Sequence, residues 1–300
     1  MIQVGIFTGY YPYTLDETIR RIKAHNIGCV QLDVSFKDCD AAKEPLTIEW
    51  AHRIRDAFRD ADLPVIAVSA YTNFIHPDPD IRRRNIEYLK RMLRFARDLG
   101  CPYVASETGT YNVESDWVWD PHNASPAVYD EAVNIIRELT AYAADWGATF
   151  IVENYVNNVI GTVEQVERMF HDVGAKNLGL ICDPTNYFDE AAMRDVDGTL
   201  RHIFDRLSPY MVIAHAKDIK AAADTGEKHA DIDADASHSF RGSGAVELPA
   251  AGLGVLNYDL YAELLAKEHP NIPLIIEHLD MEDIPRAKGF VNGVLKRAGV

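Results

Sequence analysis

The sequence predicts a single (β/α)8 barrel that covers residues 1–300. Short apolar runs alternate with longer amphipathic segments eight times, and composition does not change between them. The chain has 300 residues, of which 47% are hydrophobic, and one-domain barrels commonly have this length. A doubly wound open sheet is the main alternative. However, the first strand is not followed by the Gly-x-Gly-x-x-Gly turn that is typical of that fold.

The predicted strands are short runs rich in β-branched and apolar residues. They cover residues 4–8, 29–34, 64–70, 103–106, 149–152, 179–182, 211–214 and 273–276. The predicted helices follow at residues 14–24, 47–61, 79–99, 126 onward, 163 onward, 200–207, 257–267 and 284–297. Capping boxes are predicted at Thr14 and Thr162, and Ser125 precedes a proline in the first turn of its helix. A long loop at residues 111–125 and an irregular insertion at residues 219–242 interrupt the alternation.

Composition narrows the class of protein. The formal net charge of -16 opposes binding to nucleic acid or to anionic membranes, and Arg82-Arg83-Arg84 reads as a solvated helix face. No run of about 18 apolar residues predicts a membrane span. Residue 1 leads directly into the first strand without the features of a signal peptide. The four cysteines form no CxxC pair, so we expect a reduced, cytoplasmic setting.

Four predicted strands end in a side chain that can bind a metal ion. Glu153, Asp183, His215 and Glu277 each follow an apolar run directly. In a barrel of parallel strands these ends meet at one mouth. Three carboxylates and one imidazole form an oxygen-rich set, which suits Mn²⁺, Mg²⁺ or Co²⁺ better than a structural zinc ion. The sequence therefore predicts a divalent-metal site at the barrel mouth.

The motifs around these residues resemble those of the xylose-isomerase-like sugar isomerase/epimerase family. They are Val152-Glu153-Asn154, Cys182-Asp183-Pro184-Thr185-Asn186, His215-Ala216-Lys217-Asp218, Ile276-Glu277-His278 and Gly252-Leu253-Gly254. The family includes ketose 3-epimerases, inositol-catabolism isomerases and hydroxypyruvate isomerases, and the resemblance covers the whole barrel. It implies the same fold, with Glu153, Asp183, His215 and Glu277 as metal ligands. It also implies that Glu153 and Glu277 act as the acid/base pair.

By this resemblance the chain is expected to be a metal-dependent isomerase or epimerase of a small sugar, ketose or keto-polyol. One glutamate would remove the proton next to the carbonyl, the ion would stabilise the enediolate, and the second carboxylate would return the proton. Both outcomes, epimerisation and isomerisation, need the same residues. We expect one divalent ion, Mn²⁺ first and Mg²⁺, Co²⁺ or Zn²⁺ as alternatives. The expected partner is a small sugar or polyol, with no nucleic acid and no membrane, and the resemblance is compatible with a homo-oligomer.

Four further residues are candidates for substrate binding. Asn186 stands where several 3-epimerases of the family have a histidine, and its amide can hydrogen-bond a hydroxyl but cannot carry charge. Glu107 ends the fourth strand and is a candidate for one of three roles, as a hydroxyl acceptor, as an auxiliary base or as a cap of the next turn. Lys217 alternates with His215, so it faces the interior and reaches a substrate oxygen or forms a buried salt bridge. Arg241 follows the irregular insertion, where the family often has a substrate-binding arginine.

Three other functions fit the same fold. A dehydratase acting on an inositol-type substrate would use the same metal and base to expel a hydroxyl. An endonuclease for abasic DNA would need several zinc ions and a basic groove, against which the single strand-end histidine and the charge of -16 argue. A non-catalytic metal-binding barrel would hold the ion without turnover. A phosphorylated substrate stays open, although no clear basic phosphate cradle is present. Trp117 and Trp119 are candidates for a wall over a sugar ring, for a subunit interface or for packing on the barrel.

Overall fold

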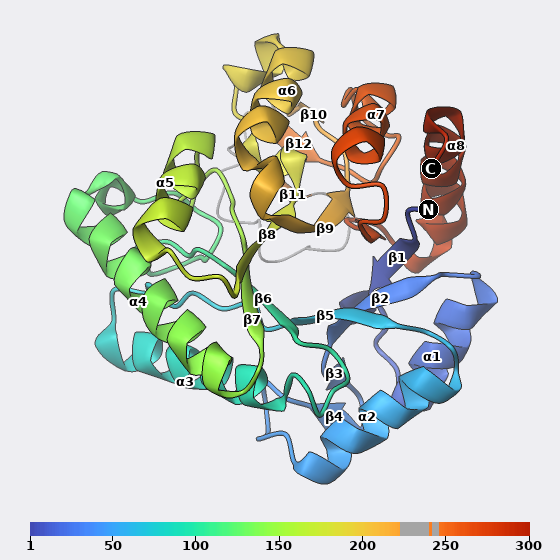
Figure 1. Cartoon of the computed structure of the whole chain (residues 1–300), viewed down its shortest axis with the longest axis horizontal. Helices are drawn as coiled ribbons and strands as arrows, with labels where there is room; N and C mark the ends of the chain where they lie inside the picture. Colours follow the sequence, from blue (N-terminus) through green and yellow to red (C-terminus); the bar gives the residue numbers. More distant parts are fainter. Residues whose placement is uncertain (223–239, 242–245) are drawn as a thin grey trace.

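The computed structural model describes residues 1–222, 240–241 and 246–300 of the chain. Eight parallel strands close into a barrel in the order β1-β13-β9-β8-β7-β6-β5-β2 (Figure 1). The barrel strands are β1 (Val4–Phe7), β2 (Cys29–Asp33), β5 (Val65–Ser69), β6 (Tyr103–Glu107), β7 (Thr149–Glu153), β8 (Leu178–Cys182), β9 (Met211–Ala216) and β13 (Leu274–Ile276). This arrangement confirms the predicted (β/α)8 barrel.

Amphipathic helices surround the barrel and cover its strands (Figure 1). In the described part of the chain they are α1 (Leu15–Ala24), α2 (Ile48–Asp60), α3 (Pro79–Phe95), α4 (Pro126–Asp145), α5 (Val163–Val173), α6 (Val196–Leu207), α7 (Tyr258–Glu268) and α8 (Ile284–Ala298). None of the helices in this part has the length and apolar character needed to span a bilayer.

One of the two predicted capping boxes is confirmed and the other is wrong. At α5 the side chain of Thr162 accepts from the backbone N–H of Gln165, and the Gln165 side chain accepts from the backbone N–H of Thr162. At α1 the side chain of Thr14 makes no cap hydrogen bond. The N–H of Leu15 instead donates to Asp38 Oδ1 at 2.9 Å. A tertiary contact thus replaces the local cap.

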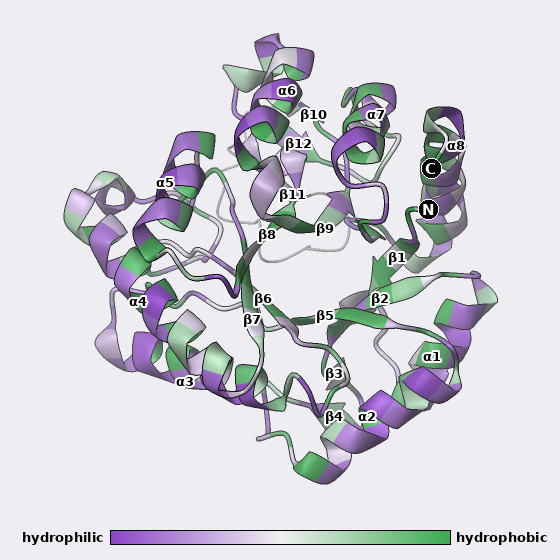
Figure 2. Ribbon diagram, in the orientation of Figure 1, coloured by the Kyte–Doolittle hydropathy of each residue, from purple (hydrophilic) through white to green (hydrophobic). Residues whose placement is uncertain are grey.

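Side-chain alternation along the strands sorts the apolar residues into two layers. The strands are largely hydrophobic and the outer faces of the helices are hydrophilic (Figure 2). Residues such as Val104 and Val152 pack outward against the helices. The inner layer fills the barrel axis and consists of Cys29, Ala67, Ala105, Ile151, Ile181, Ile213 and Ile275. The barrel is therefore a packed core and not a pore.

Gly5 is the contribution of β1 to this inner layer. A Cβ atom at this position would lie 2.5 Å from Cδ1 of Ile275 and 2.6 Å from Sγ of Cys29. Both atoms belong to the inner layer, and an added methyl group cannot fit between them without displacing one of them. The absence of a side chain at residue 5 is thus a packing requirement of the closed barrel.

Two small sheets lie outside the barrel. The strands β3 (Ser35–Phe36) and β4 (Cys39–Asp40) form a hairpin after β2. The strands β10 (Lys220–Ala221), β12 (Val246–Leu248) and β11 (Phe240–Arg241) form an antiparallel sheet after β9. The two ends of the predicted irregular segment are therefore short strands. Residues 223–239 and 242–245 lie outside the described residues, so the prediction for them stays a prediction.

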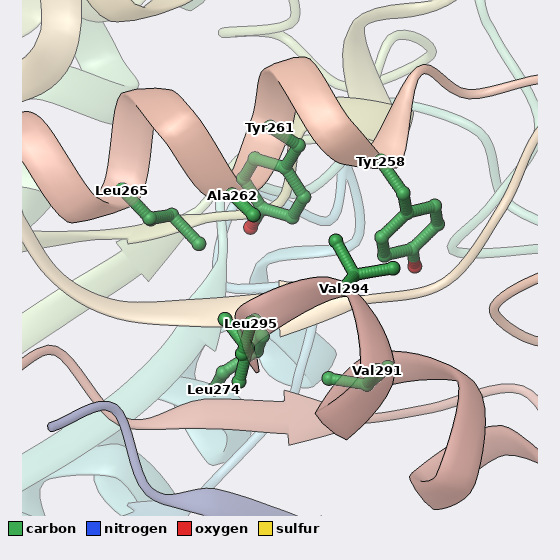
Figure 3. A pocket seen from close by; sticks show the side chains of 8 residues that line it. All are labelled: Tyr258, Tyr261, Ala262, Leu265, Leu274, Val291, Val294 and Leu295. Atoms are coloured by element: carbon green, nitrogen blue, oxygen red, sulfur yellow. The ribbon is translucent and has the colours of Figure 1, made fainter. Parts of the chain in front are cut away.

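A small cavity lies between α7, α8 and β13 (Figure 3). Its lining consists of Tyr258, Tyr261, Ala262, Leu265, Leu274, Val291, Val294 and Leu295. Its volume of about 10 Å³ is near the lower limit for one water molecule, and an apolar lining of this kind stays dry. The cavity is thus a packing gap and offers no room for a ligand.

Candidate metal and active site

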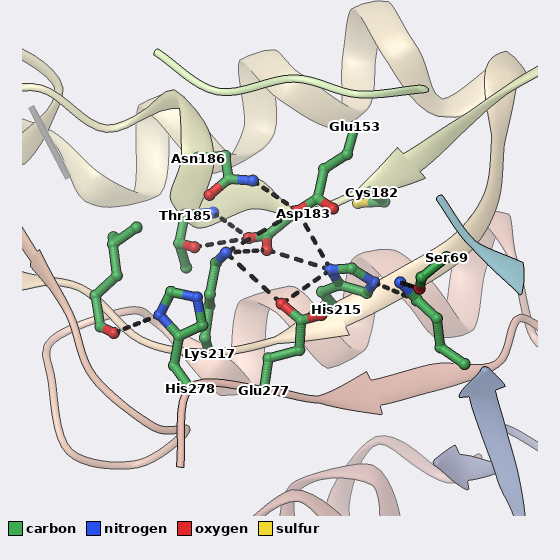
Figure 4. Close-up of polar contacts among 12 residues, drawn as sticks. Ser69, Glu153, Cys182, Asp183, Thr185, Asn186, His215, Lys217, Glu277 and His278 are labelled. Carbon is green, nitrogen blue, oxygen red and sulfur yellow. Dashed lines mark hydrogen bonds and ion pairs between the residues drawn. The ribbon is translucent and has the colours of Figure 1, made fainter. Parts of the chain in front are cut away.

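The four predicted metal ligands lie together at the C-terminal mouth of the barrel (Figure 4). Each lies two positions after an inner-layer residue, so its side chain points into the same interior. The pairs are Ile151 and Glu153, Ile181 and Asp183, Ile213 and His215, and Ile275 and Glu277. One potential ligand atom from each of the four lies within 4.8 Å of those of the other three, and all four residues are buried. The structure thus brings together the set that the strand ends predicted.

His215 turns one ring nitrogen toward this group and the other toward β2. Its Nε2 lies 2.8 Å from Oε1 of Gln31, and because an amide oxygen can only accept, Nε2 carries a proton. The amide nitrogen of Gln31 donates to Oγ of Ser69 at 3.1 Å and to the hydroxyl of Tyr71 at 3.2 Å. These two bonds fix the orientation of Gln31, and Gln31 in turn fixes the ring of His215.

The other ring nitrogen of His215 faces three carboxylates. Nδ1 lies 3.4 Å from Glu153 Oε1, 3.5 Å from Asp183 Oδ2 and 3.2 Å from Glu277 Oε2, and it is buried without a hydrogen-bond partner. Burial lowers the pKa of His215, but the charges of Glu277 and Glu153 raise it well above its ordinary value. A nitrogen surrounded in this way needs a proton or a cation beside it.

Donors from neighbouring segments hold two of the carboxylates in place. The hydroxyl of Tyr71 donates to Oε2 of Glu153, and the amide of Asn186 donates to Oε1 of Glu153 at 2.7 Å. Oδ1 of Asp183 accepts from the backbone N–H of Thr185 at 3.1 Å and from its hydroxyl at 2.6 Å. The oxygens Glu153 Oε1 and Asp183 Oδ2 face the centre of the group, so the site is preorganised.

Lys217 places a positive charge at this centre. Its side chain is 4% exposed, and its ammonium lies 2.8 Å from Asp183 Oδ2, 3.7 Å from Glu277 Oε2 and 4.0 Å from Glu153 Oε1. Burial lowers the pKa of Lys217, but Asp183, Glu277 and Glu153 raise it above its ordinary value, so the amine stays charged. For the carboxylate of Asp183 burial has the opposite effect and raises the pKa, but the positive charges of Lys217 and His215 hold this pKa below its ordinary value.

These charges fit a divalent cation. The three carboxylates of Glu153, Asp183 and Glu277 outnumber the cations of this buried group, which are the Lys217 ammonium and the protonated ring of His215, and a buried net charge is costly unless it is compensated. The donor set is also rich in oxygen, as hard divalent ions prefer. The unpartnered Nδ1 of His215 adds one neutral nitrogen ligand once its proton has left. The residues present therefore fit the metal ion that the sequence predicts.

Glu107 lies next to Glu153 at the barrel mouth, because the two residues pair in register between β6 and β7. It is 3% exposed, and its Oε2 is buried without a hydrogen-bond partner. Burial raises the pKa of Glu107 well above its ordinary value, and the charges of Asp116 and Glu153 raise it further. No described residue donates a hydrogen bond to this carboxyl group, so it does not cap the turn that follows β6.

The two tryptophans of the 111–125 loop have different surroundings. Trp117 is half-buried and packs edge-to-face on Tyr155, with ring centroids 5.9 Å apart. Trp119 is 49% exposed. Arg241 belongs to β11, where its backbone pairs with Glu247. Its side chain lies outside what the structure describes, so its role in substrate binding stays a prediction.

Asp218 holds the Gly252-Leu253-Gly254 segment before α7 in place through hydrogen bonds to backbone groups in and around it. Its carboxylate accepts from the backbone N–H groups of Ile219 at 2.9 Å, Gly252 at 3.0 Å and Leu256 at 2.9 Å. A Cβ atom on Gly254 would lie 2.2 Å from the carbonyl oxygen of Ile219 and 2.4 Å from Oδ1 of Asp218. Glycine is thus needed at residue 254 for close approach of the chain, and Asp218 anchors the loop.

Several residues of the site are absent from the sequence-based set. Gln31 and Tyr71 orient His215 and Glu153, and His278 lies beside Lys217 (Figure 4). His278 has a φ of 55°, in the left-handed region that is uncommon for a non-glycine residue and frequent at functional sites. Burial, together with Lys217, lowers the pKa of His278 to about 4, so its imidazole is neutral. A polar residue such as Gln31 at an inward-facing position of an apolar strand was the available signal.

The chain is a (β/α)8 barrel, and a buried group of three carboxylates and one histidine at its mouth could hold a metal ion. The sequence matches the model of the xylose isomerase-like TIM barrel family over residues 19–295, and the chain belongs to this family. The resemblance drawn from the strand-end motifs is thereby confirmed. No curated protein matches the sequence.

Solved structures with the same fold span the whole chain. A xylose isomerase domain protein from Planctomyces limnophilus has 18% identity and a TM-score of 0.71, with 99% of this chain and 98% of that chain covered. An L-ribulose 3-epimerase has 16% identity and a TM-score of 0.71, with 100% of this chain and 96% of that chain covered. A xylose isomerase-like TIM barrel protein from Mycobacterium smegmatis in complex with magnesium has 16% identity and a TM-score of 0.69, covering 100% and 98%. At these identities the likeness shows the fold.

Proposed function

We propose that this chain is a divalent-metal-dependent isomerase or epimerase of a small sugar, ketose or keto-polyol. The observation that carries the proposal is the convergence of three buried carboxylates and Nδ1 of His215 within 4.8 Å of one another. The family, together with the L-ribulose 3-epimerase among the structural neighbours, supports a sugar as the substrate class. D-Psicose 3-epimerase, solved with D-tagatose, has the same fold and adds to this support.

Glu153, Asp183, His215 and Glu277 are the proposed metal ligands. Three oxygen ligands and one nitrogen favour Mn²⁺, with Mg²⁺, Co²⁺ or Zn²⁺ as alternatives. One structural neighbour is in complex with magnesium and another has a bound zinc atom, which supports a divalent ion as the cofactor. The contact between His215 and Gln31 is also of the kind that orients a metal-binding histidine.

The chemistry follows from the placement of two glutamates. The ion supplies Lewis-acid polarisation of the substrate carbonyl. Glu153 and Glu277 enter the site from opposite sides (Figure 4), so a substrate carbon held between them has a carboxylate on each side. One glutamate removes the proton from the carbon next to the carbonyl and the other returns a proton. Return to the same carbon gives epimerisation, and return to the adjacent carbon gives isomerisation.

Four residues are proposed to bind the substrate. Lys217 directs its ammonium to the centre of the site, where it stabilises an oxygen that gains negative charge. Asn186 holds Glu153 through its amide nitrogen and retains an amide oxygen for a hydroxyl. Glu107 adds a buried carboxyl group beside Glu153. Arg241 is the fourth proposed substrate-binding residue, because the family often has a substrate-binding arginine in this region.

The test is proton exchange with solvent. The metal-loaded chain is incubated in D₂O with L-ribulose, D-fructose, D-tagatose and D-psicose, and deuterium incorporation is followed by NMR and mass spectrometry. We expect exchange next to the carbonyl of at least one sugar, and loss of exchange in Glu153→Gln and Glu277→Gln. A product lighter by one water would establish the dehydratase instead. Metal binding without any exchange would contradict the proposal and favour a non-catalytic barrel.

A further inference from the structure

The carboxylate of Glu277 is held differently from the other two carboxylates of the proposed site. Hydroxyl or amide groups donate to Glu153 and to Asp183. In the described part of the chain, no such group donates to Glu277. Its Oε2 instead lies 3.2 Å from Nδ1 of His215 and 3.7 Å from the ammonium of Lys217 (Figure 4). The position of this carboxylate therefore depends on the backbone that carries it.

Three segments of the chain hold that backbone. The N–H of Glu277 donates to the carbonyl oxygen of Ala216 in β9 at 3.2 Å. The N–H of the next residue, His278, donates to the hydroxyl of Tyr10 at 2.7 Å. The ring of His278 adds a third contact, because its Nδ1 lies 2.9 Å from the carbonyl oxygen of Leu248 in β12. A carbonyl oxygen can only accept, so Nδ1 carries a proton and donates it.

These contacts maintain an unfavourable backbone conformation at His278. Its φ of 55° lies in the left-handed region, which glycine and asparagine adopt more readily than other residues. Strain of this kind persists only where the surrounding structure holds the residue in place. Without the contact to Leu248, the chain is freer to return to an ordinary conformation. That change would turn the peptide between His278 and Glu277, and the carboxylate of Glu277 would move with it.

The contact to Leu248 also links two strand ends of the proposed site. The segment that follows β12 docks on the end of β9, where the N–H of Asp218 donates to the carbonyl oxygen of Pro249 at 2.7 Å. Asp218 follows the proposed ligand His215 by three positions. Because Leu248 directly precedes Pro249, the hydrogen bond from His278 closes a connection between the ends of β9 and β13.

We propose that His278 is a positioning residue, which holds the carboxylate of Glu277 in place through its left-handed backbone and its hydrogen bond to Leu248. The inference rests on the proposed function, in which Glu277 binds the ion and transfers a proton. A residue that orients a metal ligand affects metal binding and turnover together, although it does not touch the ion. A side chain that reproduces both the backbone conformation and the donor should therefore replace His278.

Three variants of His278 separate its two contributions. His278→Asn keeps both, because asparagine adopts the left-handed region readily and its amide nitrogen can donate from a position close to that of Nδ1. His278→Gly keeps the backbone conformation and removes the donor. His278→Leu removes both. Asn26→Ala is the matched control, because Asn26 has a φ of 51°, is exposed and lies between α1 and β2, at the opposite end of the barrel.

The test measures three properties of each protein. A crystal structure of the metal-free protein gives the position of the Glu277 carboxylate relative to His215. Calorimetric titration gives the dissociation constant for Mn²⁺. The kcat is measured on a ketose that the wild-type chain converts. The unfolding temperature shows whether each variant is folded.

We expect His278→Leu to displace the Glu277 carboxylate from His215, to weaken Mn²⁺ binding about tenfold or more, and to lower kcat at least as much. His278→Gly should show the same changes to a smaller extent, because its backbone conformation is kept. His278→Asn should bind Mn²⁺ and turn over within about threefold of wild type. Asn26→Ala should lower the unfolding temperature and leave Mn²⁺ binding and kcat unchanged.

Two results would overturn the inference and leave the proposed reaction intact. One is an unmoved Glu277 carboxylate with wild-type Mn²⁺ affinity in folded His278→Leu and His278→Gly. The other is a loss of turnover in His278→Asn as large as in His278→Leu, which would mean that the imidazole itself takes part in the reaction. If the carboxylate of Glu277 moves as expected but the wild-type chain converts no sugar, the reaction fails and the inference stands.

Discussion

Oε1 of Gln31 lies 2.8 Å from Nε2 of His215, and this contact directs Nδ1 of the same ring toward Glu277, 3.2 Å away. A residue in the middle of β2 thereby sets the direction in which a histidine of β9 presents its lone pair. The proposed metal site therefore depends on a polar side chain that cannot reach the ion itself.

Replacing Gln31 by leucine should weaken metal binding. The variant removes the acceptor of the Nε2 proton, so the ring of His215 loses its fixed orientation. We expect the dissociation constant for Mn²⁺ to rise about 10–100-fold, as is typical when the partner of a metal-binding histidine is lost. Calorimetric titration of the metal-free protein measures it. A Gln31→Leu protein that folds and binds Mn²⁺ like wild type would contradict this account of the contact.

Metal binding should release a proton at neutral pH. Glu277 and Glu153 overcome the effect of burial and raise the pKa of His215 well above its ordinary value, so Nδ1 carries a proton when no ion is bound. An ion must displace that proton, so affinity should rise with pH until the raised pKa is passed, and fall as pH drops below it. Calorimetry in two buffers of different ionisation enthalpy counts the protons released. The same count in wild type and in a variant without His215 would refute the assignment.

Lys217→Met should separate metal binding from catalysis. The variant removes a positive charge beside the proposed ion, so affinity for Mn²⁺ should stay equal or increase. Turnover should fall about 10²-fold or more, because the ammonium no longer stabilises charge that develops on the substrate. Lys217→Arg is the control that keeps the charge. Weaker Mn²⁺ binding in Lys217→Met would mean that Lys217 serves to position Asp183.

Gly5→Ala should destabilise the barrel. Its methyl group would lie 2.5 Å from Ile275 and 2.6 Å from Cys29, so the inner layer must shift. We expect a loss of about 1–3 kcal/mol in the free energy of unfolding, measured by denaturant titration. Gly289→Ala is the matched control, because a Cβ atom at this position in α8 meets nothing within 4 Å, and alanine is the better helix former. Equal stability of the two variants would count against a packed barrel axis.

The sequence predicted the barrel and the convergence of its strand ends because both follow from local rules. Period-two alternation places Glu153 on the same face as Ile151, and parallel strands bring such ends together. Contacts between distant segments were not predictable in this way. Thr14 has the sequence of a capping box, yet the start of α1 is held by Asp38 of the β3–β4 hairpin. Tyr71 reaches Glu153 only because β5 and β7 lie in the same barrel.

Helix boundaries show a second limit, which is local. The sequence predicts a helix at residues 200–207, but in the structure α6 begins earlier, at Val196. The side chain of Asp195 caps it by accepting from the backbone N–H of Gly198 at 2.9 Å. Gly198 in the first turn lowers the helix propensity of this segment, so the sequence pattern alone places the start of the helix too late. The cap by Asp195 compensates for the glycine and sets the actual start.

The metal content of the purified chain tests the central proposal most directly. Wild type, Glu277→Gln and the exposed control Glu282→Gln are loaded with Mn²⁺, desalted and analysed by elemental mass spectrometry. We expect about one ion per chain in wild type and in Glu282→Gln, and a clear loss in Glu277→Gln, because a buried ligand of the proposed site is removed. Absence of a bound ion in wild type after incubation with Mn²⁺, Co²⁺ or Mg²⁺, or equal metal content in all three proteins, would contradict the assignment of these four residues.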